Sequence, residues 1–289
     1  MPTKVEKDQI TGTETTGHEW DGIKELDTPL PRWWLWTFYV TILWAIGYWI
    51  LYPAWPTLTN YTHGILGASQ YQSLADQMKA AQAAKADYLN RIKAASVSEI
   101  IADKDLLDFA LAGGRTAFAD NCAPCHGSGG AGAKGYPNLA DDDWLWGGTP
   151  EAIHTTIMYG ARNGNEKAHV TEMPAFGTMG ILTPDQISDA AEFVLSLSGK
   201  ADDPAAAKRG AEIFATNCAA CHGEKGEGNT DIGAPRLSDN IWLYGGDKKT
   251  IVETITNSRG GVMPAWGPRL PETTIKMLTV YVHSLGGGQ

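Results

Sequence analysis

The stretches Cys122-Ala-Pro-Cys125-His126 and Cys218-Ala-Ala-Cys221-His222 share one pattern, in which a histidine directly follows two cysteines three positions apart. They contain all 4 cysteines of the 289-residue chain. This spacing is typical of covalent haem attachment: both thiols form thioethers to the porphyrin, and the histidine binds the iron. A zinc ribbon or a redox dithiol does not explain a histidine after each pair. The sequence therefore predicts two covalently bound haems c. The predicted anchors are Cys122, Cys125, Cys218 and Cys221, and the predicted proximal ligands are His126 and His222.

The segments around the two motifs form a repeat of about 90 residues. Each copy has an amphipathic helix, the haem motif, a glycine-rich loop, an aromatic turn, Met-Pro and a closing apolar helix. The pattern predicts two tandem all-α haem domains of the cytochrome c type, over residues 105–199 and 200–289. Residues 105–199 carry a net charge of −8 and residues 200–289 a net charge of zero. The acidic surplus either steers a basic electron donor to the first domain or simply keeps it soluble.

A methionine as sixth iron ligand gives a closed, six-coordinate iron of raised potential, suited to electron transfer. Met173 and Met263 occupy equivalent places, and the proline after each restricts the methionine backbone to extended conformations. We predict that these two methionines are the sixth ligands. The sequence leaves open whether each binds the iron of its own repeat, because like domains packed face to face could exchange their methionine loops. The rival ligands are Met158, Met179, Met277, His154, His169 and His283, of which His169 is the main one.

The aromatic turns read Trp-Leu-Trp-Gly-Gly and Trp-Leu-Tyr-Gly-Gly in the two repeats. Their large side chains either wall the haem and bind its propionates or fill the core. Two arginines before the ligand methionines either neutralise propionates or lie on the surface. The aromatic residues are Trp144, Trp146, Trp242 and Tyr244, and the arginines are Arg162 and Arg259.

Residues 33–52 contain no charge and are rich in tryptophan and tyrosine at both ends. A helix of this length spans roughly 30 Å, the thickness of a bilayer core. A buried soluble helix suits the aromatic ends less well, and a signal peptide would be shorter and start earlier. The basic residues Lys4, Lys7, Lys24 and Arg32 precede it, and the next is Lys79. The positive-inside rule therefore predicts a cytoplasmic N-terminus, with the haem domains on the periplasmic side.

The complete division predicted is a cytoplasmic arm at 1–32, a transmembrane helix at 33–52, a periplasmic linker at 53–104, and the two haem domains. The linker includes a helix over residues 70–95 that lies on a partner, lies on the first haem domain, or acts as a solvated spacer. The net charge of −10 argues against a nucleic-acid partner.

The arm contains Asp21-Gly-Ile-Lys-Glu-Leu-Asp27-Thr-Pro-Leu-Pro-Arg32-Trp-Trp. With one transmembrane helix and two c domains, it resembles the membrane-anchored di-haem subunit family of cbb3-type cytochrome c oxidases over essentially the whole chain. The resemblance implies a single-pass protein of the bacterial inner membrane. It also implies several partners: a catalytic oxidase subunit with b-type haems and copper, a mono-haem c subunit, a cytochrome c donor and the lipid bilayer.

The resemblance implies outer-sphere electron transfer from a periplasmic donor toward an oxygen-reducing core, with no catalytic residue on this chain. A stand-alone membrane-tethered di-haem carrier is the main alternative, because such a carrier needs only an apolar anchor. A di-haem peroxidase is a further alternative, but it requires an iron with an open site, and Met-Pro in both repeats argues against one.

Overall fold

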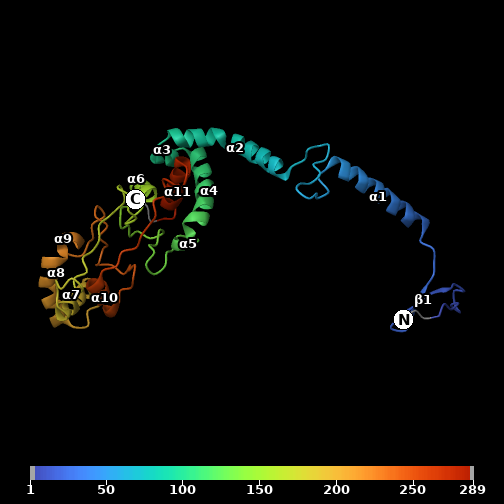
Figure 1. Cartoon of the computed structure of the whole chain (residues 1–289). Coiled ribbons are helices and arrows are strands. Elements are labelled where there is room, and N and C mark those ends of the chain that lie inside the picture. The colour runs from blue at the N-terminus through green and yellow to red at the C-terminus, as the bar shows by residue number, and fades with distance from the viewer. Residues whose placement is uncertain (1–3, 287–289) are drawn as a thin grey trace. The chain divides into compact units, whose positions relative to one another are not determined.

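The computed structural model describes residues 4–286 of a mainly helical chain, which divides into two compact units between Ala84 and Lys85 (Figure 1). The N-terminal unit begins with strands β1 (Thr15–Trp20) and β2 (Ile23–Leu26), which pair antiparallel. Asp21 and Gly22 join them, both at positive φ, as a type I′ turn requires. The sequence analysis did not anticipate this hairpin within the polar arm.

Helix α1 (Arg32–Leu51) follows the hairpin and is long and apolar enough to cross a membrane. None of its 20 residues is buried within the described chain. Its aromatic and aliphatic side chains are therefore available to lipid on every side, as a single membrane anchor requires. The predicted span agrees with α1 to within one residue.

Helix α2 (Gln70–Ala94) runs across the division between the two units. The C-terminal unit then consists of short helices joined by long loops. These are α3 (Val97–Ala102), α4 (Lys104–Asn121), α5 (Ala123–His126), α6 (Pro150–Tyr159), α7 (Pro184–Leu197), α8 (Pro204–Asn217), α9 (Ala219–His222), α10 (Lys248–Asn257) and α11 (Glu272–His283). Six of them begin with a side-chain cap that accepts hydrogen bonds from the first turn. The capping residues are Ser96, Asp103, Thr149, Thr183, Asp203 and Asp247.

The helices of the C-terminal unit do not pack in the order of the sequence repeats. Helix α11, which closes the second repeat, packs against α4 and α6 of the first. Helix α7, which closes the first repeat, packs against α8 and α10 of the second. Figure 1 shows red α11 beside green α4, and yellow α7 beside orange α8. We call α4, α5, α6 and α11 the Cys122 lobe, and α7, α8, α9 and α10 the Cys218 lobe.

Equivalent glycines allow both exchanged helices to approach closely. A Cβ on Gly114 of α4 would lie 2.2 Å from the carbonyl oxygen of Met277 in α11. A Cβ on Gly210 of α8 would lie 2.0 Å from the carbonyl oxygen of Asp189 in α7. Helix backbones can touch at these points only because glycine has no side chain. In each lobe, this close contact is therefore made with a helix of the other repeat.

Ion pairs hold α7 in the Cys218 lobe. Arg209 of α8 donates two hydrogen bonds, of 2.7 and 2.6 Å, to the carboxylate of Asp189. Glu192, which is only 1% exposed, pairs with Lys248 of α10 at 2.6 Å. Hydrogen bonding to Lys248 is the main cause that holds the pKa of Glu192 below its ordinary value. These contacts would be lost if α7 packed within its own repeat.

The predicted ranges 105–199 and 200–289 therefore describe sequence repeats that do not coincide with the packing groups. The charge difference between the repeats also disappears when residues are grouped by lobe. Residues 105–172 with 263–286 hold 10 acids and 6 bases, and residues 173–262 hold 12 acids and 8 bases. Each group has a net charge of −4. Net charge therefore gives no reason for a basic donor to prefer the Cys122 lobe.

The end of α2 belongs to the Cys122 lobe, one of the alternatives left open by the sequence. Ile92 is fully buried, and Tyr88 stacks on Phe109 of α4 with ring centroids 4.7 Å apart. Lys276 of α11 reaches the end of α2 and donates to the carbonyl oxygens of Ile92, Lys93 and Ala95 at 3.3, 2.9 and 2.8 Å. A cation at a helix C-terminus is favourable because it complements the helix dipole.

Candidate haem sites

Both motif histidines are oriented by the same hydrogen bond. Nδ1 of His126 lies 2.9 Å from the carbonyl oxygen of Pro137, and Nδ1 of His222 lies 2.9 Å from that of Pro235. A proton on Nδ1 donates to the carbonyl and leaves Nε2 as a lone-pair donor. Burial lowers the pKa of both histidines and favours the neutral ring that an iron ligand needs. Sequence reasoning missed these carbonyls, although a Gly-x-Pro-x-Leu pattern recurs at both places.

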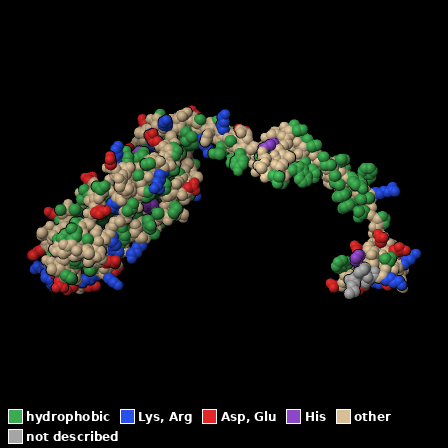
Figure 2. Space-filling model, viewed as in Figure 1, with side chains coloured by type: hydrophobic (Ala, Val, Ile, Leu, Met, Phe, Trp, Pro, Cys, Tyr) green, Lys and Arg blue, Asp and Glu red, His purple; other side chains and the backbone are tan. Residues whose placement is uncertain are grey.

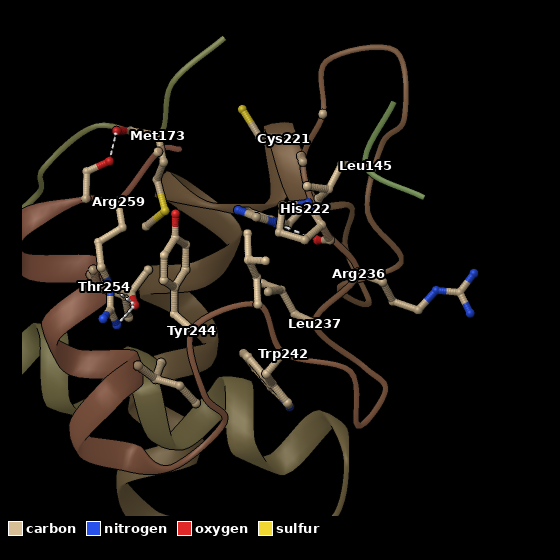
Figure 3. Close-up of a pocket in the computed structure, with 18 of the residues that line it drawn as sticks. Leu145, Met173, Cys221, His222, Arg236, Leu237, Trp242, Tyr244, Thr254 and Arg259 are labelled. Carbon is tan, nitrogen blue, oxygen red and sulfur yellow. Dashed lines mark hydrogen bonds between the residues drawn. The ribbon is translucent and has the colours of Figure 1, made fainter. Parts of the chain in front are cut away.

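The Cys218 lobe contains a cavity of about 820 Å³. His222 and Met173 both line it, and Figure 3 shows the imidazole and the thioether pointing toward one another. Cys218 and Cys221 are at the same cavity wall as His222. Much of the remaining lining is apolar or aromatic, as expected for the site of a large flat macrocycle. These apolar and aromatic residues include Phe176, Phe214, Ile251, Ile255 and Trp242.

Met173 thus lies in the cavity of the second motif, although it belongs to the first repeat. Its carbonyl oxygen accepts a hydrogen bond of 2.6 Å from the Ser258 hydroxyl at the end of α10. The chain beyond it continues along α10, because the Phe176 amide donates to the Ile255 carbonyl at 3.1 Å. Backbone hydrogen bonds of this kind fix the position of the methionine loop.

Met263 makes the reciprocal crossing into the Cys122 lobe. Its amide and carbonyl pair with those of Ala161 just after α6, at 2.9 and 3.0 Å. The Asn163 side chain also donates to the Met263 carbonyl at 2.7 Å. Met263 packs on the core cluster of the Cys122 lobe, as do Cys122 and Ala123 of the first haem motif. Each of the two predicted sixth ligands therefore lies beside the haem motif of the other repeat.

The rival ligands have other surroundings. Met277 is buried in the core with Ile92, whereas Met179 is 66% exposed. Met158 packs in the Cys122 lobe, with its sulfur near Gly267. His169 stacks on Trp146 with ring centroids 4.0 Å apart, and its Nε2 lies 3.0 Å from the Thr156 hydroxyl. A histidine held in this way already uses the nitrogen that would bind an iron.

Aromatic residues join the two lobes in a reciprocal way. The Trp146 ring lies against Gly233, where a Cβ would come within 2.3 Å of the ring. Tyr244, its counterpart in the second repeat, lies 3.4 Å from the place of a Cβ on Gly135. The Gly135 amide also donates to the carbonyl of Leu243 at 2.8 Å. Each glycine stands two residues before the proline that orients a haem-motif histidine, so these contacts couple the two haem-binding loops.

The other two tryptophans of the turns have a local role. Trp144 packs in the core cluster of the Cys122 lobe and Trp242 in that of the Cys218 lobe. Each ring also covers the second glycine of its own turn, Gly148 or Gly246. Core filling, one of the two predicted roles, describes Trp144, whereas Trp242 both packs on the core and lines the Cys218 cavity.

The two arginines both line the Cys218 cavity, in non-equivalent ways. Arg259 lies over the ring of Tyr244, 4.8 Å from its centroid, and donates to the Thr250 carbonyl at 2.8 Å. Arg162 comes from the other repeat and donates to the carbonyls of Gly261 and Thr171 at 2.7 and 3.1 Å. Both guanidinium groups therefore place positive charge beside the cavity.

The donor set and the cavity fit haem c. Two thiols adjoin an imidazole whose Nε2 is free, and a thioether faces that imidazole across an apolar space. The fold and these sites define a membrane-anchored di-haem cytochrome c.

Comparison with known proteins gives the family. Residues 12–59 match the family model described as the N-terminal domain of cytochrome oxidase-cbb3, FixP. Residues 111–198 match cytochrome c, and residues 205–282 match cytochrome c oxidase, cbb3-type, subunit III. The cbb3-type cytochrome c oxidase subunit FixP of Azorhizobium caulinodans is 59% identical over 98% of this chain and 96% of that protein. FixP of Bradyrhizobium sp. strain ORS 278 is 55% identical over the full length of both chains. CcoP of Azospirillum sp. strain B510 is 55% identical over 98% of each.

The chain belongs to the FixP/CcoP family of cbb3-type cytochrome c oxidase subunits. It is an electron-transfer subunit that carries two covalently bound haems c, and it forms a complex with other oxidase subunits. The resemblance noted from its sequence is thus confirmed.

Proposed function

We propose that this subunit passes electrons from a periplasmic cytochrome c donor toward the oxygen-reducing core of its oxidase through two crossed histidine–methionine sites. His126 and Met263 would hold one iron, and His222 and Met173 the other. The observation that carries the proposal is the cavity of the Cys218 lobe, where His222 and Met173 face one another from different repeats. When bound, each haem supplies one-electron exchange at its iron.

The residues of the chain then have defined tasks. The carbonyls of Pro137 and Pro235 orient the two imidazoles, and burial favours their neutral form. Met173 and Met263, on the crossed loops, would each supply a thioether to an iron, which would disfavour binding of outside ligands and favour a raised potential. Because the loops cross, neither repeat would complete a site alone, and both sites would lie in one compact C-terminal unit. Such placement would favour electron exchange between the two haems.

For the topology, we infer a cytoplasmic N-terminus and periplasmic haem lobes. Lys4, Lys7 and Lys24 precede α1, Arg32 begins it, and no Lys or Arg follows it until Lys79. The proposed partners are the catalytic subunit with b-type haems and copper, a mono-haem c subunit and a soluble or membrane-bound cytochrome c. Because α1 carries no ionisable group beyond Arg32 except tyrosine, proton transfer would belong to the oxidase core.

Purification of the tagged chain in mild detergent tests the proposal. Copurification of b-type haem, copper and oxygen-reducing activity, with rapid reduction by a cytochrome c, is expected. Recovery of the di-haem chain alone, with respiration unaffected by its deletion, would instead indicate a stand-alone carrier. In the same preparation, Met173→Ala and Met263→Ala should each open one ferrous haem to carbon monoxide, whereas Met179→Ala should open none. If neither variant binds carbon monoxide, the assigned ligands are wrong.

A further inference from the structure

The loop between α1 and α2 has exposed apolar side chains that take no part in the haem sites. The chain has no Lys, Arg, Asp or Glu between Arg32 and Asp76, so the uncharged stretch extends well beyond α1. Figure 2 shows hydrophobic side chains along this stretch, with no red or blue among them. The exposed apolar residues of the loop are Trp55, Leu58, Tyr61, Ile65 and Leu66.

The loop folds back onto the end of α1. The amides of Ile65 and Leu66 donate to the carbonyls of Ile50 and Leu51, at 2.9 and 3.1 Å. Gly64 makes this return possible: its φ is +72°, and a Cβ there would lie 2.5 Å from the Leu51 oxygen. Two of the terminal carbonyls of α1, which lack partners within the helix, are thereby satisfied. Ile65 and Leu66 consequently lie level with the last turn of α1.

The loop also satisfies much of its own backbone. The Thr57 amide and hydroxyl both donate to the Asn60 carbonyl, at 2.6 and 2.7 Å. The Trp55 amide donates to the Thr62 hydroxyl at 2.9 Å, and the Thr62 amide donates to the Trp55 carbonyl at 2.9 Å. Internal pairing is what an irregular segment needs if it leaves bulk water, because unsatisfied amides are costly in lipid.

We propose that residues 53–66 form a membrane-surface loop seated at the headgroup–acyl boundary of the leaflet in which α1 ends. The 20 residues of α1 already match the bilayer core, so its last turn lies at that boundary. Residues hydrogen-bonded to that turn lie at the same depth. Tryptophan and tyrosine are the side chains that prefer this layer, and the loop presents Trp55 and Tyr61 there.

Lipid explains the loop better than a protein partner does, because its apolar side chains are spread over its length. Leu58, at the tip, is fully exposed, while Ile65 and Leu66 are 76% and 57% exposed beside α1. A bilayer surface can cover all of them at once. The loop would then fix the depth of α1. This inference requires α1 to be a membrane anchor and is independent of the electron path.

Spin labels test the depth of the loop in the intact oxidase reconstituted into lipid vesicles. A cysteine would replace Leu58 or Ile65 for nitroxide labelling, because the four native cysteines are bound to haem. Leu43 in the middle of α1 provides the lipid reference, and the exposed Gln82 of α2 provides the water reference. Collisions of each label with oxygen and with a polar nickel chelate are then measured.

Labels at Leu58 and Ile65 should collide often with oxygen and rarely with nickel. The ratio of the oxygen collision rate to the nickel collision rate should exceed the ratio at Gln82 by about tenfold or more, because a polar chelate is excluded from an apolar layer. Frequent nickel collisions at both positions would overturn the proposal in favour of water. Rare collisions with both reagents would overturn it in favour of a protein partner. As a matched perturbation, Ile65→Asp with Leu66→Asp should make the Leu58 label water-like while Leu43 stays unchanged.

Discussion

Replacing Lys276 by methionine should weaken the attachment of the end of α2 to the Cys122 lobe. The ammonium group is the donor to three carbonyls at the end of α2, and its side chain is only 11% exposed. Hydrogen bonds from a charged donor contribute about 1.5–3 kcal/mol each when they act singly. Because three acceptors share one ammonium group and water can reach part of the helix end, we expect a local loss of about 3 kcal/mol, including the interaction with the helix dipole. Methionine keeps most of the apolar stem, so packing should change little.

Amide hydrogen exchange measures this loss directly. A local loss of about 3 kcal/mol corresponds to roughly 100-fold faster exchange at residues 90–95, with haem absorption unchanged. Lys93→Met is the matched control, because Lys93 is exposed and its side chain points to solvent, and it should leave exchange unchanged. Lys276→Arg should restore part of the protection. Exchange within about threefold of the wild type in Lys276→Met would refute the reasoning, since that ratio is below 1 kcal/mol.

Three further predictions concern the lobes. Gly114→Ala should lower the free energy of unfolding by about 1–3 kcal/mol in thermal or denaturant melts, because the new methyl group meets a backbone carbonyl of α11. Gly129→Ala, in open space, should change little. Gly233→Ala should destabilise the contact between the two lobes, because the new methyl group would push on the Trp146 ring. Adding Trp146→Ala should recover part of the lost stability. Strictly additive effects of the two substitutions would contradict the contact. Burial, with Asp239 and Asp141 nearby, raises the pKa of Asp143 to about 6. Ionisation of this carboxylate therefore lowers the stability of the fold as pH rises from 4 to 6. Asp143→Asn should raise the free energy of unfolding by about 1 kcal/mol at pH 7, a value reduced to allow for the half-exposed position, and by nothing below pH 4. Urea unfolding at the two pH values measures the difference.

Local patterns in the sequence were sufficient for the elements that depend on neighbouring residues. The two haem motifs, the apolar run of α1 and the helix of α2 each carry their own signal, and the structure and comparisons agree with them. The hairpin at Asp21-Gly22 also has a recognisable turn signal, which was overlooked because the surrounding arm is polar.

The exchange of α7 and α11 could not be predicted, because the repeats present the same motifs in the same order. Met173 and Met263 have equivalent sequence surroundings, and tertiary contacts such as those with Ser258 and Ala161 show in which lobe each lies. These partners lie 85 or more residues away in the chain. The same separation explains why the charge surplus of the first repeat is divided between the two lobes. Long-range hydrogen bonds of Lys276 were likewise invisible to any local pattern.

A cryo-electron microscopy map of the intact, haem-loaded oxidase would show whether the two irons have crossed coordination. In crossed sites, density from the iron held by His126 leads to the sulfur of Met263, and density from the iron held by His222 leads to that of Met173. Density joining His126 with Met173 and His222 with Met263 would contradict crossed coordination.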